Sequence, residues 1–290
     1  LIVHDLHPNY ETTKWAISQK GINKVGIQHH FAHIISCMAE NGIEEDVFGI
    51  AWDGTGYGED GTVWGGEFLK CNYLNYKRAA NFKPIKLLGG EKAIKEPRRI
   101  ALSMLFDVFG EECFSLPIPT LEAFNINELK ILFKAWERDI NSPSSSSAGR
   151  MFDAVASLIG IKQIINYEGQ AAMMIEDLYA PDIKDIYPYT IKENIIDWSD
   201  IIRAVVYDKN KKAVPSIFIN TLADIIYRVA KSTGNKKICL SGGVFQNDPL
   251  VTKTLELLSG EFQVFLNRKV PPNDGGISFG QVVYGGLVDI

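Results

Sequence analysis

Residues 47–58 join an apolar run to a glycine-rich run: Val47-Phe48-Gly49-Ile50-Ala51-Trp52-Asp53-Gly54-Thr55-Gly56-Tyr57-Gly58. The first six residues have the length and composition of a buried strand. A glycine-rich turn then leads to a second β-branched and aromatic run over residues 62–69, which predicts a hairpin. The pattern therefore places the carboxylate of Asp53 at the end of a buried strand, beside backbone that can approach a phosphate or a metal ion closely. The alternative is that these glycines only form the hairpin turn.

The order of strand, glycine turn and helix occurs again in the second half of the chain. Residues 236–240 read as a strand that leads into Ser241-Gly242-Gly243-Val244-Phe245-Gln246-Asn247, and residues 262–266 lead through two prolines to Asn273-Asp274-Gly275-Gly276. Strands that alternate with helices are typical of α/β proteins. We therefore expect an α/β fold of two lobes that face a cleft, with residues 1–145 in the N-terminal lobe and residues 146–290 in the C-terminal lobe.

Hydrophobic periodicity predicts helices in much of the remaining chain. The spacing is clearest over residues 29–40, where Asn41-Gly42 provides a stop. Further helical segments are expected over residues 12–18, 97–134, 150–159, 169–178 and 216–231. Residues 141–149 read Asn-Ser-Pro-Ser-Ser-Ser-Ser-Ala-Gly, a composition that predicts a mobile loop without a packed core.

The composition is that of an ordinary globular chain. Its 290 residues are 46% hydrophobic, 11% aromatic and 22% charged, which argues against disorder. A formal charge of -5 leaves no broad basic surface, so we expect no nucleic-acid partner. No apolar run approaches the roughly 18 residues of a membrane span, and the first residues lack a signal pattern. We therefore expect neither membrane insertion nor export.

Two features bear on the compartment and origin of the chain. The four cysteines are widely spaced, so they suggest neither a zinc knuckle nor a disulfide framework, and a reducing cytoplasm fits them. The sequence starts at Leu1 inside an apolar stretch, so we expect a fragment of a longer protein.

All five histidines lie within the first 33 residues, which suggests a metal site. In a helix over residues 29–40, His29 and His33 face the same side and can bind one ion, while His30 points about 100° away. The alternative is that they are surface or hydrogen-bonded histidines. A zinc-protease site is disfavoured because its glutamate would have to occupy position 30. The strand-end carboxylates Asp53 and Asp274 are natural further ligands, and such mixed ligation suits iron, zinc or manganese better than magnesium alone.

A second candidate site would bind a nucleotide. Gly242 and Gly243 precede a helix, where unpaired N–H groups can hold a phosphate. The alternative is a tight turn that serves only packing. The surrounding sequence matches neither the Walker motif nor the dinucleotide fingerprint. Asp153 and Glu168 lie near the starts of expected helices, where they either contact sugar hydroxyls or only interact with the helix dipoles.

Taken together, these motifs resemble the HypF carbamoyltransferase family of nickel–iron hydrogenase maturation. The matching segments keep their order along the chain: Asp5-Leu6-His7-Pro8, Gln28-His29-His30-Phe31-Ala32-His33, Asp53-Gly54-Thr55-Gly56-Tyr57-Gly58, Trp64-Gly65-Gly66-Glu67, Tyr167-Glu168-Gly169-Gln170-Ala171-Ala172, Ser241-Gly242-Gly243-Val244-Phe245-Gln246-Asn247 and Asn273-Asp274-Gly275-Gly276-Ile277. The resemblance covers the C-terminal part of that family, which is related to the threonylcarbamoyl transferases that modify tRNA. It implies the actin-like ATPase (ASKHA) fold, with two lobes around a nucleotide cleft.

The resemblance also implies an activity, cofactors and partners. In that family, ATP and carbamoyl phosphate are converted to carbamoyl-adenylate in a preceding domain. The part that resembles this chain transfers the carbamoyl group to the C-terminal cysteine of a HypE-type acceptor protein, towards the cyanide ligand of the hydrogenase. AMP or ADP would bind as product or analogue. Iron or zinc is the expected metal, with magnesium as a further candidate.

Two sets of residues carry over from the family. The metal-binding set is His29, His33, Asp53 and Asp274. The nucleotide-binding set is Gly242, Gly243 and Asn247, with Asp153 and Glu168 as ribose contacts. The family's zinc-finger cysteine pairs, its acylphosphatase-like domain and its adenylate-forming domain are absent from this sequence. The family also has further strands before Asp5, so we expect the first lobe to be incomplete here.

Two other interpretations stay open. A related O-carbamoyltransferase or tRNA threonylcarbamoyl transferase would share the cleft but accept a hydroxyl or an amine, and these motifs do not specify the acceptor. A non-enzymatic actin-like module would bind a nucleotide without needing His29 and His33. Bound iron or zinc would therefore distinguish a transferase from such a module.

Overall fold

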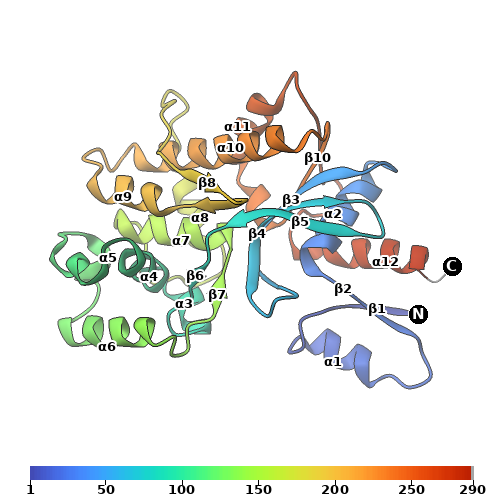
Figure 1. Ribbon diagram of the computed structural model, residues 1–290, viewed down its shortest axis with the longest axis horizontal. Helices are drawn as coiled ribbons and strands as arrows, with labels where there is room; N and C mark the ends of the chain where they lie inside the picture. The colour runs from blue at the N-terminus through green and yellow to red at the C-terminus, as the bar shows by residue number, and fades with distance from the viewer. Residues whose placement is uncertain (289–290) are drawn as a thin grey trace.

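A mixed β-sheet forms the centre of the molecule (Figure 1). The computed structural model describes residues 1–288, and in this range the sheet has nine strands. The main path runs β11-β10-β3-β4-β5-β9-β8, and β7 pairs with β4 and β6 beside it. The strands are β3 (Val47–Tyr57), β4 (Val63–Cys71), β5 (Tyr76–Phe82), β6 (Ile85–Lys86), β7 (Ser144–Ser145), β8 (Thr190–Lys192), β9 (Ile195–Asp197), β10 (Lys237–Ser241) and β11 (Gln263–Leu266).

The predicted hairpin is confirmed, but its glycine-rich part is not the turn. β3 continues through the glycines to Tyr57 and pairs antiparallel with β4, and the register shifts between Trp52 and Gly56. Such an irregularity releases the intervening residues from the ladder and redirects their side chains. The chain turns after β3, where Gly61 has a φ of 77°. The shift leaves Asp53 outside the regular pairing, facing the candidate site.

The described part of the chain has twelve α-helices, and the helix predicted over residues 29–40 has those bounds. The segment predicted as helical over residues 97–134 is divided because Gly110 adopts a positive φ and Pro119 starts a new helix. The helices are α1 (Glu11–Ser18), α2 (His29–Glu40), α3 (Glu91–Lys95), α4 (Pro97–Phe109), α5 (Pro119–Glu122), α6 (Ile126–Glu137), α7 (Ala148–Leu158), α8 (Gln170–Glu176), α9 (Ser199–Tyr207), α10 (Val214–Thr233), α11 (Asp248–Leu258) and α12 (Ile277–Val288). Three short 3₁₀ helices are η1 (Gly110–Ser115), η2 (Gly243–Gln246) and η3 (Asp274–Gly276).

Separate hydrophobic cores cover the two faces of the sheet. β3 is buried on both faces, which explains its continuous apolar sequence. Phe48 and Trp52 belong to the larger core, with side chains of α4, α7 and α10. Val47 and Ala51 belong to the smaller core, with side chains of α2. The sheet therefore fixes the position of α2, which carries two of the candidate metal ligands.

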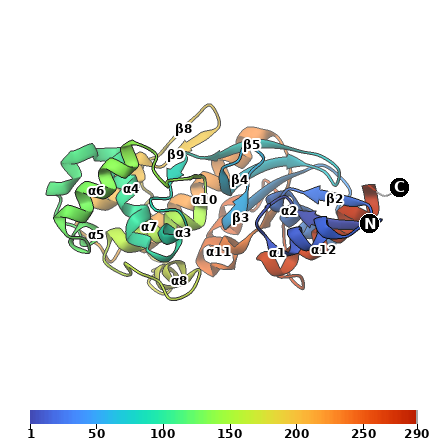
Figure 2. The ribbon, with the colours of Figure 1, turned by 90° about the horizontal axis from the view of Figure 1, so that it is seen from below.

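The first residues form a small sheet at one end of the molecule. β1 (Ile2–Asp5) pairs in parallel with β2 (Lys24–Ile27), and Asp5 lies opposite Ile27 in the register. Figure 2 shows this pair and α1 beside α12 at the end that carries both termini, with α4, α5 and α6 at the opposite end. The parallel pairing brings Asp5 close to the start of α2.

The prediction of a mobile loop over residues 141–149 is wrong. Ser145, Ser146 and Ser147 are buried, and the first of them belongs to β7. The hydroxyl of Ser146 donates to the buried carboxylate of Glu67, and the Ser147 hydroxyl accepts from the N–H of Arg150 at the start of α7. Composition was misleading because serine hydroxyls can pack inside a protein when each has a hydrogen-bond partner.

The division into lobes at residues 145 and 146 stays a prediction. The central sheet joins strands from both sides of this division, because β10 pairs with β3. No helix within residues 1–288 is long and apolar enough to cross a membrane.

Candidate metal and nucleotide site

Four side chains from distant parts of the chain converge where the register of β3 shifts, between Trp52 and Gly56. His29 and His33 come from α2, Asp53 from β3 and Asp274 from η3, and one potential ligand atom from each lies within 4.8 Å of the others. Asp53 Oδ2 lies 3.0 Å from His33 Nε2 and 3.8 Å from His29 Nε2. Asp274 Oδ1 lies 3.5 and 3.6 Å from the same two nitrogen atoms. The side chains proposed from the sequence as metal ligands therefore lie together.

Local sequence explains why α2 can present both imidazoles. The side chain of Gln28 caps the helix by accepting from the N–H of Phe31, so the helix begins at His29. The four-residue spacing then places His29 and His33 on one face. Gly56 lets β3 approach this face, because a Cβ at that position would lie 2.8 Å from His29 Cδ2 and 2.4 Å from the ring of His30. A glycine is thus needed where strand and helix meet.

The histidines and carboxylates of the cluster shift one another's pKa values. Burial opposes a charge on His29 and His33, but hydrogen bonds to the surrounding carboxylates outweigh it and raise the pKa of both imidazoles. Burial would also raise the pKa of Asp53, yet the two histidines hold it well below its ordinary value. The two carboxylates therefore stay ionised and require positive charge beside them, from protons or from a metal ion.

The geometry and the hydrogen bonding of the cluster both fit a metal ion. Ligand atoms about 2.1 Å from an ion are about 3.0–3.4 Å apart in octahedral or tetrahedral geometry. The separations of 3.0–3.8 Å are close to these values. The buried Nε2 atom of His29 has no hydrogen-bond partner, as expected for a nitrogen reserved for a metal. The residues therefore fit an ion, and two imidazoles with two carboxylates suit iron, zinc or manganese.

Asp5 supports the cluster from behind, a role that the sequence analysis missed. Its Oδ2 lies 2.8 Å from Nδ1 of His29, and both side chains are buried. A carboxylate in this position fixes the tautomer and the orientation of the ring. The motif Asp5-Leu6-His7-Pro8 was visible in the sequence, but the pairing of β1 with β2 that brings Asp5 to His29 was not.

His30 does not join the cluster. Its ring is fully buried and tilted against Trp64, with ring centroids 6.2 Å apart. Burial and the nearby charges of His29 and His33 lower its pKa well below the ordinary value, so it is neutral. This position agrees with the direction predicted from helical geometry.

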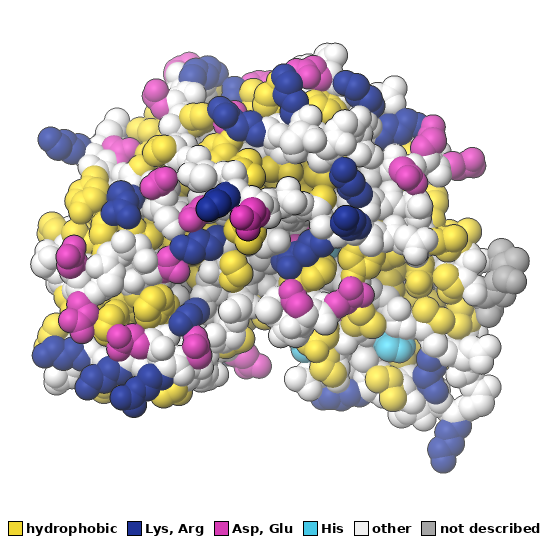
Figure 3. All heavy atoms as spheres, viewed as in Figure 1, with side chains coloured by type: hydrophobic (Ala, Val, Ile, Leu, Met, Phe, Trp, Pro, Cys, Tyr) yellow, Lys and Arg dark blue, Asp and Glu magenta, His cyan; other side chains and the backbone are white. Residues whose placement is uncertain are grey.

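A cavity of about 420 Å³ opens beside the cluster. Asp53 and Asp274 lie on its wall, so the candidate ion would border the cavity directly. The side chain of Asp274 is 64% exposed, whereas that of Asp53 is 13% exposed. Figure 3 shows that the molecular surface is hollowed at its lower edge between the two halves of the molecule. Other lining residues that the argument uses are Gly243, Arg150, Asp153 and Glu168.

The wall opposite the cluster combines one buried cation with two acids. Nη1 of Arg150 lies 2.8 Å from Asp153 Oδ2, and its Nη2 lies 3.9 Å from Glu168 Oε1. Burial raises the pKa of Asp153 to about 6, against the lowering effect of Arg150. The sequence analysis named both acids but missed Arg150, because its burial depends on how α7 packs.

Three residues of the segment 241–247 were predicted to bind a nucleotide, namely Gly242, Gly243 and Asn247, and they differ in whether they reach the cavity. Gly243 lines the cavity, whereas Gly242 and Asn247 do not belong to its wall. Gly242 has a φ of 102° and its N–H donates to the carbonyl of Pro272, so this group is not available to an anion. The side chain of Asn247 caps α11 by accepting from the N–H of Leu250. Gly242 and Asn247 thus shape the turn, and their contact with a nucleotide stays a prediction.

Comparison with known proteins identifies the class of protein to which the chain belongs. Two family models match the chain: the HypF Kae1-like domain over residues 1–40, and the second subdomain of the carbamoyltransferase Kae1-like domain over residues 49–281. The chain therefore has the actin-like fold of Kae1-like domains, as predicted. It belongs to the carbamoyltransferase HypF family.

Individual relatives agree with this assignment. The chain is 40% identical to carbamoyltransferase HypF of Synechocystis sp., with 97% of this chain and 39% of that protein covered. It is 31% identical to a carbamoyltransferase HypF homolog of Cupriavidus necator, with 97% of this chain and 76% of that protein covered. The crystal structure of full-length HypF in the phosphate- and nucleotide-bound form matches with a TM-score of 0.91 and 42% identity, over 99% of this chain and 46% of that one. The chain thus spans less than half the length of the HypF proteins in the first and third of these comparisons.

Proposed function

We propose that this chain carries out carbamoyl transfer in hydrogenase maturation. The substrate is carbamoyl-adenylate, made from carbamoyl phosphate and ATP by another part of a HypF protein, and the acceptor is the C-terminal cysteine of a HypE-type protein. Membership of the HypF family supports the reaction class. The observation that carries the proposal is the four-residue cluster, whose two carboxylates, Asp53 and Asp274, line a cavity of about 420 Å³.

In this proposal, His29, His33, Asp53 and Asp274 hold an iron or zinc ion. Such an ion supplies Lewis acidity that polarises a carbonyl or phosphate oxygen. Asp5 keeps the ring of His29 oriented by accepting its Nδ1–H. Burial of both imidazoles excludes water from all but the Asp274 side of the cluster.

The other end of the cavity binds the adenosine part. Asp153 and Glu168 accept hydrogen bonds from ribose hydroxyls, and Arg150 holds Asp153 in place. The backbone around Gly243 lies next to the phosphate, where the absence of a side chain permits close approach. This arrangement directs the carbamoyl carbon towards the cluster.

Transfer then requires an incoming thiolate from outside the chain. Its sulfur forms a bond to the carbamoyl carbon, the bond from that carbon to the phosphate oxygen breaks, and AMP leaves with the negative charge. All four cysteines of this chain are buried, so the acceptor thiol comes from a partner. The open side of the cavity at Asp274 is the route that we assign to that thiol.

The test combines the purified chain, loaded with iron or zinc, with carbamoyl-adenylate and a peptide that ends in cysteine. Mass spectrometry should detect carbamoyl addition to this peptide. Matched peptides that end in serine or lysine report a hydroxyl or amine acceptor. Transfer to either of them but not to the cysteine peptide would overturn the acceptor assignment. No transfer by protein that holds both metal and nucleotide would overturn the proposed activity.

A further inference from the structure

A second cavity lies away from the candidate site, and several of its lining residues are basic. It has a volume of about 380 Å³ and lies between strands β4 and β5 and the C-terminal half of α10. Its four cationic residues are Lys70, Lys77, Arg78 and Arg228, and no acidic residue lines it. Figure 3 shows several Lys and Arg side chains close together near β5, right of the centre. This concentration is notable in a chain with a net charge of -5.

The two lysines are direct neighbours across the sheet. Lys70 of β4 and Lys77 of β5 are partners in the antiparallel register, so their side chains leave the same face. Like charges in this position destabilise a strand pair. Lys70 is also the register partner of Phe48, which places both lysines on the face towards the larger core and α10.

The arginines have carboxylate partners, and the lysines have none among the described ion pairs. Arg78 is paired with Glu67 and Asp60, and Arg228 with Asp224. Neither lysine has a carboxylate within 4.0 Å in residues 1–288, although both share an adjoining pocket with Asp46. Two positive charges at the cavity are therefore left without a counter-charge.

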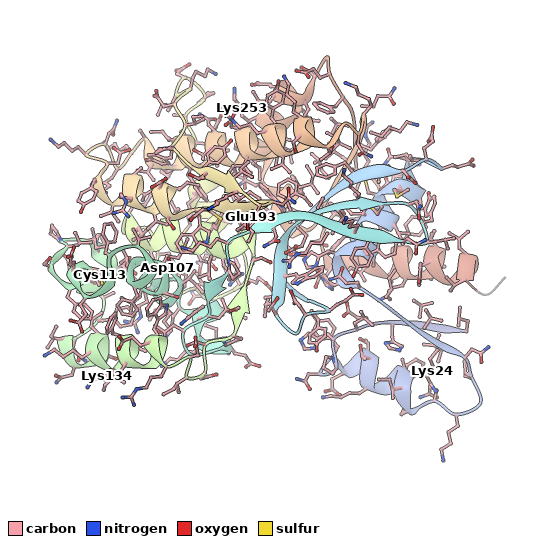
Figure 4. All side chains as sticks on the ribbon, viewed as in Figure 1. Lys24, Asp107, Cys113, Lys134, Glu193 and Lys253 are labelled. Carbon is pink, nitrogen blue, oxygen red and sulfur yellow. The ribbon has the colours of Figure 1, made fainter. Side chains whose placement is uncertain are left out.

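The cavity also offers neutral hydrogen-bonding groups. Ser232 and Thr233 line it from α10, and Asn194 from the tip of the β8–β9 hairpin. Figure 4 labels Glu193, which precedes Asn194 and lies near the end of β5, but this side chain is not part of the cavity wall. The wall thus combines two unbalanced charges with polar groups in a space suited to a compact ligand.

We propose that this cavity is a second anion site, separate from the nucleotide cavity, which binds a phosphate group between Lys70 and Lys77. Two uncompensated cations match the charge of a phosphate dianion, and the ligand relieves their mutual repulsion. Both inorganic phosphate and phosphate monoesters carry this chemistry. The proposal does not depend on the carbamoyl-transfer activity.

The experiment titrates the metal-free chain at low ionic strength with inorganic phosphate and, separately, with methyl phosphate. Amide NMR signals of Ala79, Ala80, Ser232 and Thr233 should shift in a saturable manner. Preference for one probe identifies whether the free ion or an ester is the better ligand. Signals that move only around Gly243 and Asn273 would assign the phosphate to the nucleotide cavity and overturn the proposal.

Variants provide the second measurement. Lys70→Gln and Lys77→Gln should each weaken the binding constant about threefold, and the double variant about tenfold. Lys70→Glu should abolish binding while it stabilises the strand pair by pairing with Lys77. The matched control is Lys24→Gln with Lys134→Gln, two exposed lysines that Figure 4 shows far from β5. Equal binding by the folded double variant, the Lys70→Glu protein and the control would overturn the proposal.

Discussion

Nδ1 of His29 lies 2.8 Å from Oδ2 of Asp5, in a contact that joins the first strand of the chain to the first turn of α2. The Asp5 carboxylate holds Nδ1, so the opposite nitrogen, Nε2, is the one that faces Asp53 and Asp274 in the cluster. Asp5 thus determines which face of this imidazole is available to an ion.

Replacement of Asp5 by asparagine should weaken metal binding about 10- to 100-fold, because the ring loses a charged partner that sets its tautomer and basicity. Competition with a chromophoric chelator measures the dissociation constant. Asp182→Asn, at an exposed acid, is the control. Equal affinities for the three proteins would show that Asp5 does not support the ion.

Replacement of His33 by alanine should remove bound metal and carbamoyl transfer together, since His33 provides the nitrogen nearest to Asp53. Elemental analysis of the purified protein measures the metal, and circular dichroism checks the fold. His7→Ala is the matched control, because His7 stacks on Tyr10 outside the cluster. Stoichiometric metal in the folded His33→Ala protein would contradict the ligand assignment.

Adenosine binding should depend on pH through Asp153, whose pKa is about 6 because of burial. Below this pH the carboxyl is protonated and accepts ribose hydroxyls poorly, and above it the ionised form accepts them well. The affinity should therefore rise about tenfold between pH 5 and pH 7.5. Calorimetry with adenosine avoids titration of phosphate groups. The Asp153→Asn protein should show a flat profile, and an unchanged slope in this variant would exclude Asp153 as the titrating group.

Replacement of Gly243 by valine should weaken ADP binding sharply and also lower metal affinity. A Cβ at this position would lie 2.9 Å from Oδ1 of Asp53, so the added side chain fills the cavity wall and displaces a candidate ligand. Parallel titrations with ADP and with metal separate the two effects. The control is Gly286→Ala on α12, where a Cβ meets no atom within 4 Å. If the valine variant binds ADP as tightly as the wild type, Gly243 does not belong to the nucleotide-binding site.

The sequence was informative where local spacing alone determines geometry. Helical periodicity places His29 and His33 on one face, and the end of an apolar strand marks Asp53. It was uninformative where a contact depends on pairing between distant segments. Asp5 reaches His29 only through the parallel pairing of β1 and β2, and Arg150 is buried only because α7 packs against the sheet.

The serine-rich segment, residues 141–149, shows that amino-acid composition alone can also mislead a structural prediction. Ser146 and Ser147 have the composition of a flexible linker, but Glu67 and the carbonyl of Asp53 accept hydrogen bonds from their hydroxyls. A one-dimensional pattern does not reveal such partners, because they come from strands earlier in the chain. The same segment therefore packs against the strand that carries Asp53.

Asp274 lies near the end of the described chain, whereas the two imidazoles that it faces lie near the beginning. During synthesis on the ribosome, Asp274 emerges after the other three side chains of the cluster. A nascent or truncated chain thus cannot complete the cluster, and an ion that bridges its ends would close a very long loop. An ion held by all four side chains would therefore tie the segment around Asp274 to the first strands and helices of the chain.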